Sequence, residues 1–196
     1  EIIDPQNFGA IFRTAHFLNI DGVVVCAKNS APLSPVVSKA SSGAMETIKV
    51  YQTNAMHKFL AKCVDDGFNV IGLANQSGAE NVSNLSLNQP TVLVVGNEGS
   101  GLRTNVRRAC SRIAKIEGGG DDENNATTNT NNKTTSVESL NVSVATAIAL
   151  FQLTSSTTKS VPYTHLRAHE TVLDIVCRLL LEKKNLIHLY QLTIHS

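Results

Sequence analysis

Residues 4–15 (Asp-Pro-Gln-Asn-Phe-Gly-Ala-Ile-Phe-Arg-Thr-Ala) combine an amide and a guanidinium that could bind an anion. Asp4-Pro5 is a helix-start signal, so we expect Asn7 at the start of a helix and Arg13 nearly two turns later. The N–H groups of a helix start suit an anion such as an RNA phosphate, and Gly9 would let another backbone approach closely. The segment alone is ambiguous, because Asn7 could only cap the helix and Arg13 could be a solvated side chain.

A second segment, residues 94–102 (Val-Val-Gly-Asn-Glu-Gly-Ser-Gly-Leu), ends an apolar run in a turn with three glycines. Such a turn at the carboxyl end of a strand lets a ligand contact the backbone. A dinucleotide-binding motif is excluded, because the glycine spacing is G-x-x-G-x-G and the apolar Ile116 stands where an acidic residue would be needed. A P-loop is excluded, because no Gly-Lys-Ser/Thr follows. Glu98 is either an acceptor for N–H groups of the turn or a carboxylate of the site.

The third segment, residues 139–150 (Ser-Leu-Asn-Val-Ser-Val-Ala-Thr-Ala-Ile-Ala-Leu), predicts the start of another helix. Ser139 or Asn141 could cap it, while Val142, Ala145 and Ala149 recur at a spacing that predicts a closely packed face. A side chain that caps a helix can also face a ligand, so the structural and functional interpretations are compatible.

Alternating apolar helices and strands would position these segments. Apolar periodicity predicts helices over residues 7–18, 55–64, 102–109 and 142–153, and short apolar runs predict strands over 23–27, 69–73, 91–95 and 113–116. Uniformly apolar strands that alternate with helices indicate an α/β fold, a mostly parallel sheet with helices on both faces.

The composition of the 196 residues suits one compact domain, and a net charge of +1 provides no overall attraction to nucleic acid. RNA contacts would therefore need a local basic patch, for which the candidates are Arg103, Arg107, Arg108, Arg112 and Lys115. Four cysteines without metal-ligand spacing predict buried thiols and no metal. No apolar run reaches the roughly 18 to 20 residues of a membrane helix, so no membrane partner is expected.

Together the three segments resemble the SpoU/TrmH family of S-adenosylmethionine-dependent RNA ribose 2′-O-methyltransferases, over about residues 4–153. The second and third segments are highly specific as a pair. Residues 29–46 look most like the mitochondrial rRNA methyltransferase 1 branch, whose target is a guanosine of large-subunit rRNA. Two alternatives stay open: a non-catalytic knotted RNA-binding or ribosome-assembly factor, and a tRNA 2′-O-methyltransferase.

The resemblance also implies a site. It implies that S-adenosyl-L-methionine, the methyl donor, contacts Gly96, Ile116 and Leu140, mostly through their backbone. Arg13 would activate the ribose hydroxyl, and the residues that would orient Arg13, the ribose and the phosphate are Asn7, Glu98, Ser139 and Asn141. The family further implies a C-terminal deep trefoil knot (the SPOUT fold), an rRNA substrate and a homodimer whose knots contribute to each other's sites. Location would be mitochondrial or plastid for a eukaryotic chain, which the Asn/Thr-rich tract favours, and cytoplasmic otherwise.

We expect a methyltransferase domain over residues 1–154, truncated at its amino end relative to the family, and a linker over 155–161. Residues 118–136 predict a low-complexity insertion within the donor-binding connection, which would weaken donor affinity. Residues 163–171 (Tyr-Thr-His-Leu-Arg-Ala-His-Glu-Thr) match the in-frame translation of a transposase sequencing adapter. Residues 162–196 are therefore predicted to be adapter read-through and not a domain.

Overall fold

A computed structural model describes residues 2–28, 30–97, 99–118 and 139–156 of the chain. All of these belong to one compact unit, residues 1–159. Glu98, residues 119–136 of the predicted insertion and the predicted adapter segment lie outside the described residues.

Every helix and strand predicted above is present, with ends that shift by a few residues. The helices are α1 (Pro5–Phe17), α2 (Pro35–Ala40), α3 (Ala44–Thr47), α4 (Met56–Asp65), the 3-10 turn η1 (Val82–Asn84), α5 (Thr104–Arg108) and α6 (Val142–Ser156). The strands are β1 (Val23–Cys26), β2 (Val50–Thr53), β3 (Asn69–Leu73), β4 (Glu80–Asn81), β5 (Thr91–Val94) and β6 (Arg112–Lys115).

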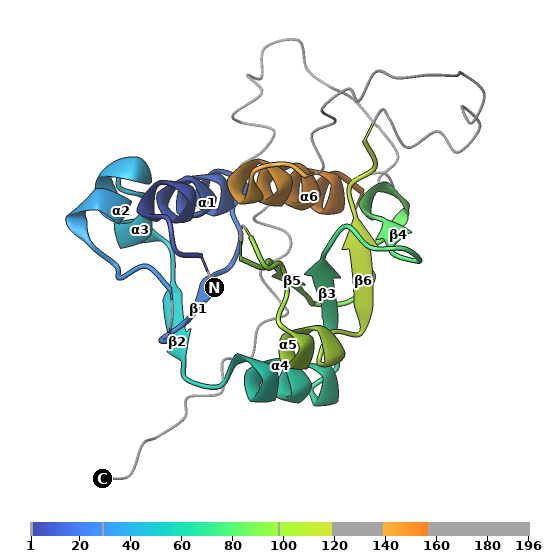
Figure 1. Ribbon diagram of the computed structural model, residues 1–196. Helices are drawn as coiled ribbons and strands as arrows, with labels where there is room; N and C mark the ends of the chain where they lie inside the picture. The colour runs from blue at the N-terminus through green and yellow to red at the C-terminus, as the bar shows by residue number, and fades with distance from the viewer. Residues whose placement is uncertain (1, 29, 98, 119–138, 157–196) are drawn as a thin grey trace, which may run out of the picture. The chain divides into compact units, whose positions relative to one another are not determined.

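The strand pairs of the described residues are parallel, as predicted, but hydrogen bonds divide the strands into two sheets (Figure 1). One sheet joins β1 to β2, and the other has the order β4-β6-β3-β5. Ile71 of β3 lies opposite both Leu93 of β5 and Arg112 of β6. Because parallel strands end at a common edge, residues 95–101 after β5 and 116–118 after β6 leave the sheet on the same side.

Helices cover both faces of the larger sheet, which confirms the predicted layering. Successive residues of a strand point to opposite faces. Ile71 packs in a cluster with Ala149 and Leu153 of α6, whereas its neighbour Val70 packs with Leu60 of α4. Figure 1 shows the same division, with α1 and α6 on one side of the strands and α4 and α5 on the other.

The segment that the sequence analysis left unassigned contains α2, α3 and β2. Pro35 occupies the first turn of α2, where its missing N–H costs no hydrogen bond. Ser42 and Gly43 then have φ of 55° and 82°, so the left-handed backbone separates α2 from α3. Helices of six and four residues are too short to show an apolar period.

Gly9 serves helix packing, because the backbone that approaches it closely is that of α2. A Cβ at this position would lie 2.4 Å from the Cβ of Ala40 and 2.8 Å from the carbonyl oxygen of Val37. The bare Cα therefore lets α1 lie directly against α2, and Gly9 is buried there. The contact fixes the helix that carries Asn7 and Arg13.

The described cysteines are free thiols, of which Cys63 is buried as predicted, while Cys26 and Cys110 are half-buried. Burial raises the pKa of Cys110 from 9.0 to about 11, and its Sγ donates to the carbonyl oxygen of Val106 at 3.3 Å. Burial, with a smaller effect from the carboxylate of Asp66, also raises the pKa of Cys63. Within the described ranges, three or more potential metal ligands do not gather anywhere, and the helices lack the length and apolarity to cross a membrane.

We predict that iodoacetamide alkylates Cys110 far more slowly in the folded chain than in the urea-unfolded chain at pH 8. A pKa of about 11 in place of 9.0 lowers the reactive thiolate fraction by about 100-fold. Because the folded pKa is the higher one, the thiol's contribution to stability is complete below pH 9 and is lost as the pH rises toward about 11. Peptide mass spectrometry of time-resolved alkylation measures the rates, and equal rates at Cys110 in the folded and unfolded chains would contradict the burial.

Candidate active site

The first and third motifs meet through a hydrogen bond between two side chains. The amide nitrogen of Asn141 donates to the amide oxygen of Asn7 at 2.9 Å, across 134 positions of sequence. The helices α1 and α6, which carry the two motifs, also pack against each other. Two of the predicted site residues therefore lie in direct contact.

The amide oxygen of Asn141 fixes the orientation of this side chain. It accepts from the backbone N–H of Ser143 at 2.8 Å, from the hydroxyl of Ser143 at 2.6 Å and from the N–H of Val144 at 3.4 Å. Asn141 is thus the cap of α6, one of the two predicted candidates, and Ser139 is an exposed residue just before it. With its oxygen held by the helix start, Asn141 can offer only its NH₂ group to Asn7.

The interpretation of Asn7 as a helix cap is wrong. Asp4 is the N-cap of α1, because its carboxylate accepts from the N–H of Gln6 at 2.9 Å and Pro5 begins the helix. Asn7 therefore lies inside the first turn, half-buried. The capping role belongs to Asp4, and the side chain of Asn7 faces the start of α6.

The glycine-rich turn closes on itself directly after β5. The N–H of Asn97 donates to the carbonyl oxygen of Gly101 at 2.9 Å, and the N–H of Gly101 donates back at 3.0 Å. The side-chain oxygen of Asn97 accepts from the N–H groups of Gly99 and Ser100 inside the turn. A Cβ on Gly96 would lie 2.3 Å from the carbonyl carbon of Gly101, so only glycine permits this closure.

The three predicted donor-binding residues occupy the ends of three elements. Gly96 follows β5, Ile116 follows β6 and Leu140 precedes α6, with half of the Leu140 side chain exposed (49%). Val95 and Val142 pack against one apolar cluster, which ties the turn to the start of α6. The arrangement fits a donor held by backbone groups at the sheet edge, with apolar side chains beside it.

Arg13 lies away from the Asn7–Asn141 pair. Six residues of helix separate it from Asn7, which is about 9 Å along the axis of α1. It lines a shallow groove with exposed aromatic rings of both helices, Phe17 (76% exposed) and Phe151 (61% exposed). Within the described part of one chain, Arg13 is thus positioned by α1 but is not brought beside Asn141.

The basic residues of the predicted RNA patch have different environments. Arg107 donates to the side-chain oxygen of Gln76 at 3.2 Å, and Arg112 lies 3.9 Å from the carboxylate of Glu80. Arg103 lines a cavity that the sequence analysis did not find. The patch is therefore divided between α5 and β6.

A match to a family model shows the family to which the chain belongs. Residues 1–151 match the model of the SpoU rRNA Methylase family. The chain belongs to the SpoU rRNA methylase family. This confirms the resemblance that the three motifs carry.

Similar proteins support the predicted branch of the SpoU family. The chain is 41% identical over 163 residues to "rRNA methyltransferase 1, mitochondrial" of Dictyostelium discoideum, covering 81% of this chain and 28% of that protein. It is 37% identical to the human protein of the same name, covering 79% and 43%. A third relative is "23S rRNA (guanosine-2'-O-)-methyltransferase RlmB" of Shewanella oneidensis, at 33% identity, covering 77% and 55%. The chain thus spans about half or less of the length of these relatives.

Solved structures agree with the SpoU assignment. An AdoMet-bound rRNA methyltransferase from Sinorhizobium meliloti superposes with a TM-score of 0.64 at 25% identity, covering 78% of this chain and 52% of that one. The A. aeolicus TrmH/SpoU tRNA modifying enzyme has a TM-score of 0.66 at 22% identity, covering 80% and 71%, and supports the fold alone. The α/β fold with parallel sheets is therefore that of SpoU methyltransferases.

We predict that the contact between Asn7 and Asn141 of this SpoU domain is measurable as a coupling. Asn141→Ala should cost about 0.5–2 kcal/mol, because α6 loses its cap, and Asn7→Ala should cost less. A double-mutant cycle in urea should give a coupling of roughly 0.5 kcal/mol, since both side chains are partly hydrated. Asn141→Ser keeps a good cap without reaching Asn7 and serves as control. A coupling of zero would contradict the contact.

Proposed function

We propose that this chain is the methyltransferase part of an S-adenosylmethionine-dependent enzyme that methylates a ribose 2′-hydroxyl of RNA, a guanosine of organellar large-subunit rRNA. The observation that carries the proposal is the Asn141–Asn7 hydrogen bond, which joins two motifs of the family 134 positions apart. The names of the relatives above support rRNA as the substrate and the mitochondrion as the location.

The donor site proposed here lies where β5 and β6 end and α6 begins. Gly96 and Ile116 would contact S-adenosylmethionine through their backbone, and Leu140 would cover it with an apolar side chain. When bound, this cofactor supplies an electrophilic methyl group on a sulfonium. The C-terminal deep trefoil knot that the family implies would lie beside this donor site.

The protein's own residues would position and polarise the nucleophile. A guanidinium is already protonated at neutral pH, so it cannot accept the hydroxyl proton. Arg13 would instead donate hydrogen bonds to the ribose 2′-oxygen and stabilise the negative charge that develops there, while the proton passes to an RNA phosphate or to water. Asn7, Asn141 and Ser139, together with Glu98, would hold the ribose and phosphate in line with the methyl group.

A homodimer would bring Arg13 to the rest of the site. The sequence of α6 is apolar on all sides, yet only one side of it is buried against the core, where Thr146, Ala149 and Leu153 pack. The opposite side leaves Val144 and Phe151 exposed, and Phe151 lines one groove with Phe17 of α1. We propose that a second copy covers this α1–α6 face, so that each guanidinium acts in the site of the other copy.

The dimer is tested by sedimentation of the whole chain. Phe151→Asp should place a charge in the covered face and shift the chain to monomer, with the donor still bound. Phe68→Asp, an exposed aromatic residue after α4, is the matched control and should leave the mass unchanged. Monomeric wild-type protein at concentrations where methyl transfer proceeds would refute the dimer.

The activity is tested by calorimetry with S-adenosylmethionine, followed by mapping of 2′-O-methyl groups on large-subunit rRNA and on tRNA. Binding of the donor with methylation of rRNA is the expected result. Methylation of tRNA but not of rRNA would show that the substrate is tRNA. RNA binding without any donor binding would favour a ribosome-assembly factor and overturn the proposal that the protein is an enzyme.

A further inference from the structure

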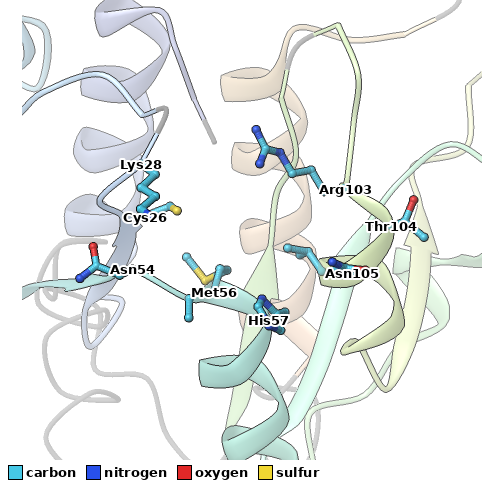
Figure 2. A pocket seen from close by; sticks show the side chains of 10 residues that line it. Cys26, Lys28, Asn54, Met56, His57, Arg103, Thr104 and Asn105 are labelled. Carbon is cyan, nitrogen blue, oxygen red and sulfur yellow. The ribbon is translucent and has the colours of Figure 1, made fainter.

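A cavity of about 350 Å³ opens between the end of β1, the connection from β2 to α4, and the start of α5 (Figure 2). This volume lies within the range of small-ligand sites. Its lining residues come from three separate stretches of sequence, which are 26–28, 54–57 and 103–106. We call it the β1–α5 cavity.

Two cationic side chains face this cavity from opposite sides. Figure 2 shows Lys28 beside Cys26 on the β1 side and the guanidinium of Arg103 extending from the α5 side. Both side chains are exposed, and none of the described lining residues is an aspartate or glutamate. The rim therefore attracts an anion that can reach both cations, such as the phosphates on either side of one nucleotide.

The interior of the β1–α5 cavity is apolar. Met56 projects between the two cationic sides in Figure 2, and Ala55 and Val106 complete the apolar surface. The amides of Asn54 and Asn105 lie at its edge and can donate to and accept from the edge of a base. A cationic rim around an apolar interior with amides suits a nucleobase that carries phosphates better than it suits inorganic phosphate alone.

The cavity is separate from the proposed catalytic groups. Gly96, Ile116 and Leu140 do not line it, and it lies beside α4 and α5, whereas Arg13 lies on α1. It is nevertheless next to the glycine-rich turn, since Arg103 follows Gly101 by two positions. A strand of RNA with its reactive ribose near that turn would pass this cavity.

We propose that the β1–α5 cavity binds one unpaired nucleotide of the substrate RNA, next to the nucleotide that is methylated. This rests on the proposed function. The base would enter the apolar interior against Met56, and Lys28 and Arg103 would each bind a flanking phosphate. RNA recognition of this kind reads single-stranded bases that leave the stack.

The test measures binding of a short single-stranded RNA of mixed sequence to the full chain by fluorescence anisotropy at several salt concentrations. The double variant Lys28→Ala/Arg103→Ala should lower the slope of log Kd against log salt by about 0.7 for each lost phosphate contact. The control Lys39→Ala/Lys58→Ala removes the same charge from exposed positions on α2 and α4 and should keep the slope. Equal slopes for the two double variants would overturn the proposal.

The apolar interior is tested separately. Met56→Glu should weaken RNA binding at least about 10-fold by placing a carboxylate beside the phosphates, and Met56→Leu should retain it. Guanosine monophosphate titrated alone should bind far more weakly than the RNA. If the free nucleotide binds as tightly as the RNA and this binding is lost in Lys28→Ala/Arg103→Ala, the cavity is a site for a free nucleotide. That result would overturn the proposal that it binds a nucleotide within an RNA strand.

Calorimetry with S-adenosylmethionine on every variant separates the two hypotheses, because none of these residues lines the proposed donor site. Intact donor binding with unchanged RNA binding in the cavity variants would overturn this inference and leave the proposed function in place. If the unsubstituted chain does not bind S-adenosylmethionine, the proposed function is refuted instead. Thermal unfolding followed by circular dichroism identifies any variant that fails to fold.

Discussion

Arg13→Ala should lower methyl transfer by about 10²- to 10⁴-fold while S-adenosylmethionine binds as before. The reason is that the guanidinium is proposed to act on the ribose hydroxyl and not on the donor. Arg13 is exposed on α1, so its removal leaves no cavity in the core. Single-turnover methyl transfer from tritiated donor measures the rate, and calorimetry measures the donor affinity.

Two further variants sharpen this result. Arg13→Lys keeps the positive charge but loses the planar fork of donors, so we expect most of the rate to be lost. Lys39→Ala removes an exposed cation from the neighbouring helix α2 and should leave the rate unchanged. Donor binding that disappears together with activity in Arg13→Ala would refute the proposed role.

The second large effect concerns Gly96→Ala, which should weaken donor binding at least about 10-fold and destabilise the domain by roughly 1–3 kcal/mol. The new Cβ would lie 2.3 Å from the carbonyl carbon and 2.5 Å from the carbonyl oxygen of Gly101. These are backbone atoms, which cannot rotate away as a flexible side chain can. The turn would have to open, and the backbone that is proposed to hold the donor would move with it.

Gly99→Ala is the matched control within the same turn. A Cβ at Gly99 would lie 3.7 Å from the side-chain oxygen of Asn97, which is an ordinary contact. We expect this variant to keep donor affinity within about twofold, since no backbone has to shift. Calorimetry and urea unfolding of both variants make the comparison. Equal losses at the two glycines would show that glycine content, and not the closure at Gly96, determines donor binding.

The buried strands could be predicted from the sequence because their apolar residues are contiguous. Residues 69–73 were predicted as a strand, and β3 has those bounds. The division into two sheets could not be predicted, because pairing partners depend on contacts between segments far apart in sequence. A close backbone approach at Gly9 could be predicted, but not which backbone it is, since the atoms that exclude a Cβ belong to Val37 and Ala40 of another helix.

The candidate site shows the same limit. Asn141 was a predicted cap and is one, because capping depends on residues two and three positions away. That Asp4 would displace Asn7 as the cap of α1 follows from Pro5 at the first helical position, a signal that was present in the sequence. The β1–α5 cavity had no such signal, since its three lining segments share no motif.

The hydrogen bond between Asn7 and Asn141 also governs when the site can form during synthesis. The contact of α1 with α2 joins residues about thirty positions apart, so it can form early on the ribosome. The contact with α6 must wait until Asn141 is made, 134 positions after Asn7, and translating that stretch takes on the order of ten seconds. The Asn7–Asn141 contact of the proposed site therefore forms only after α6 has been synthesised, well after the segments of α1 and α2.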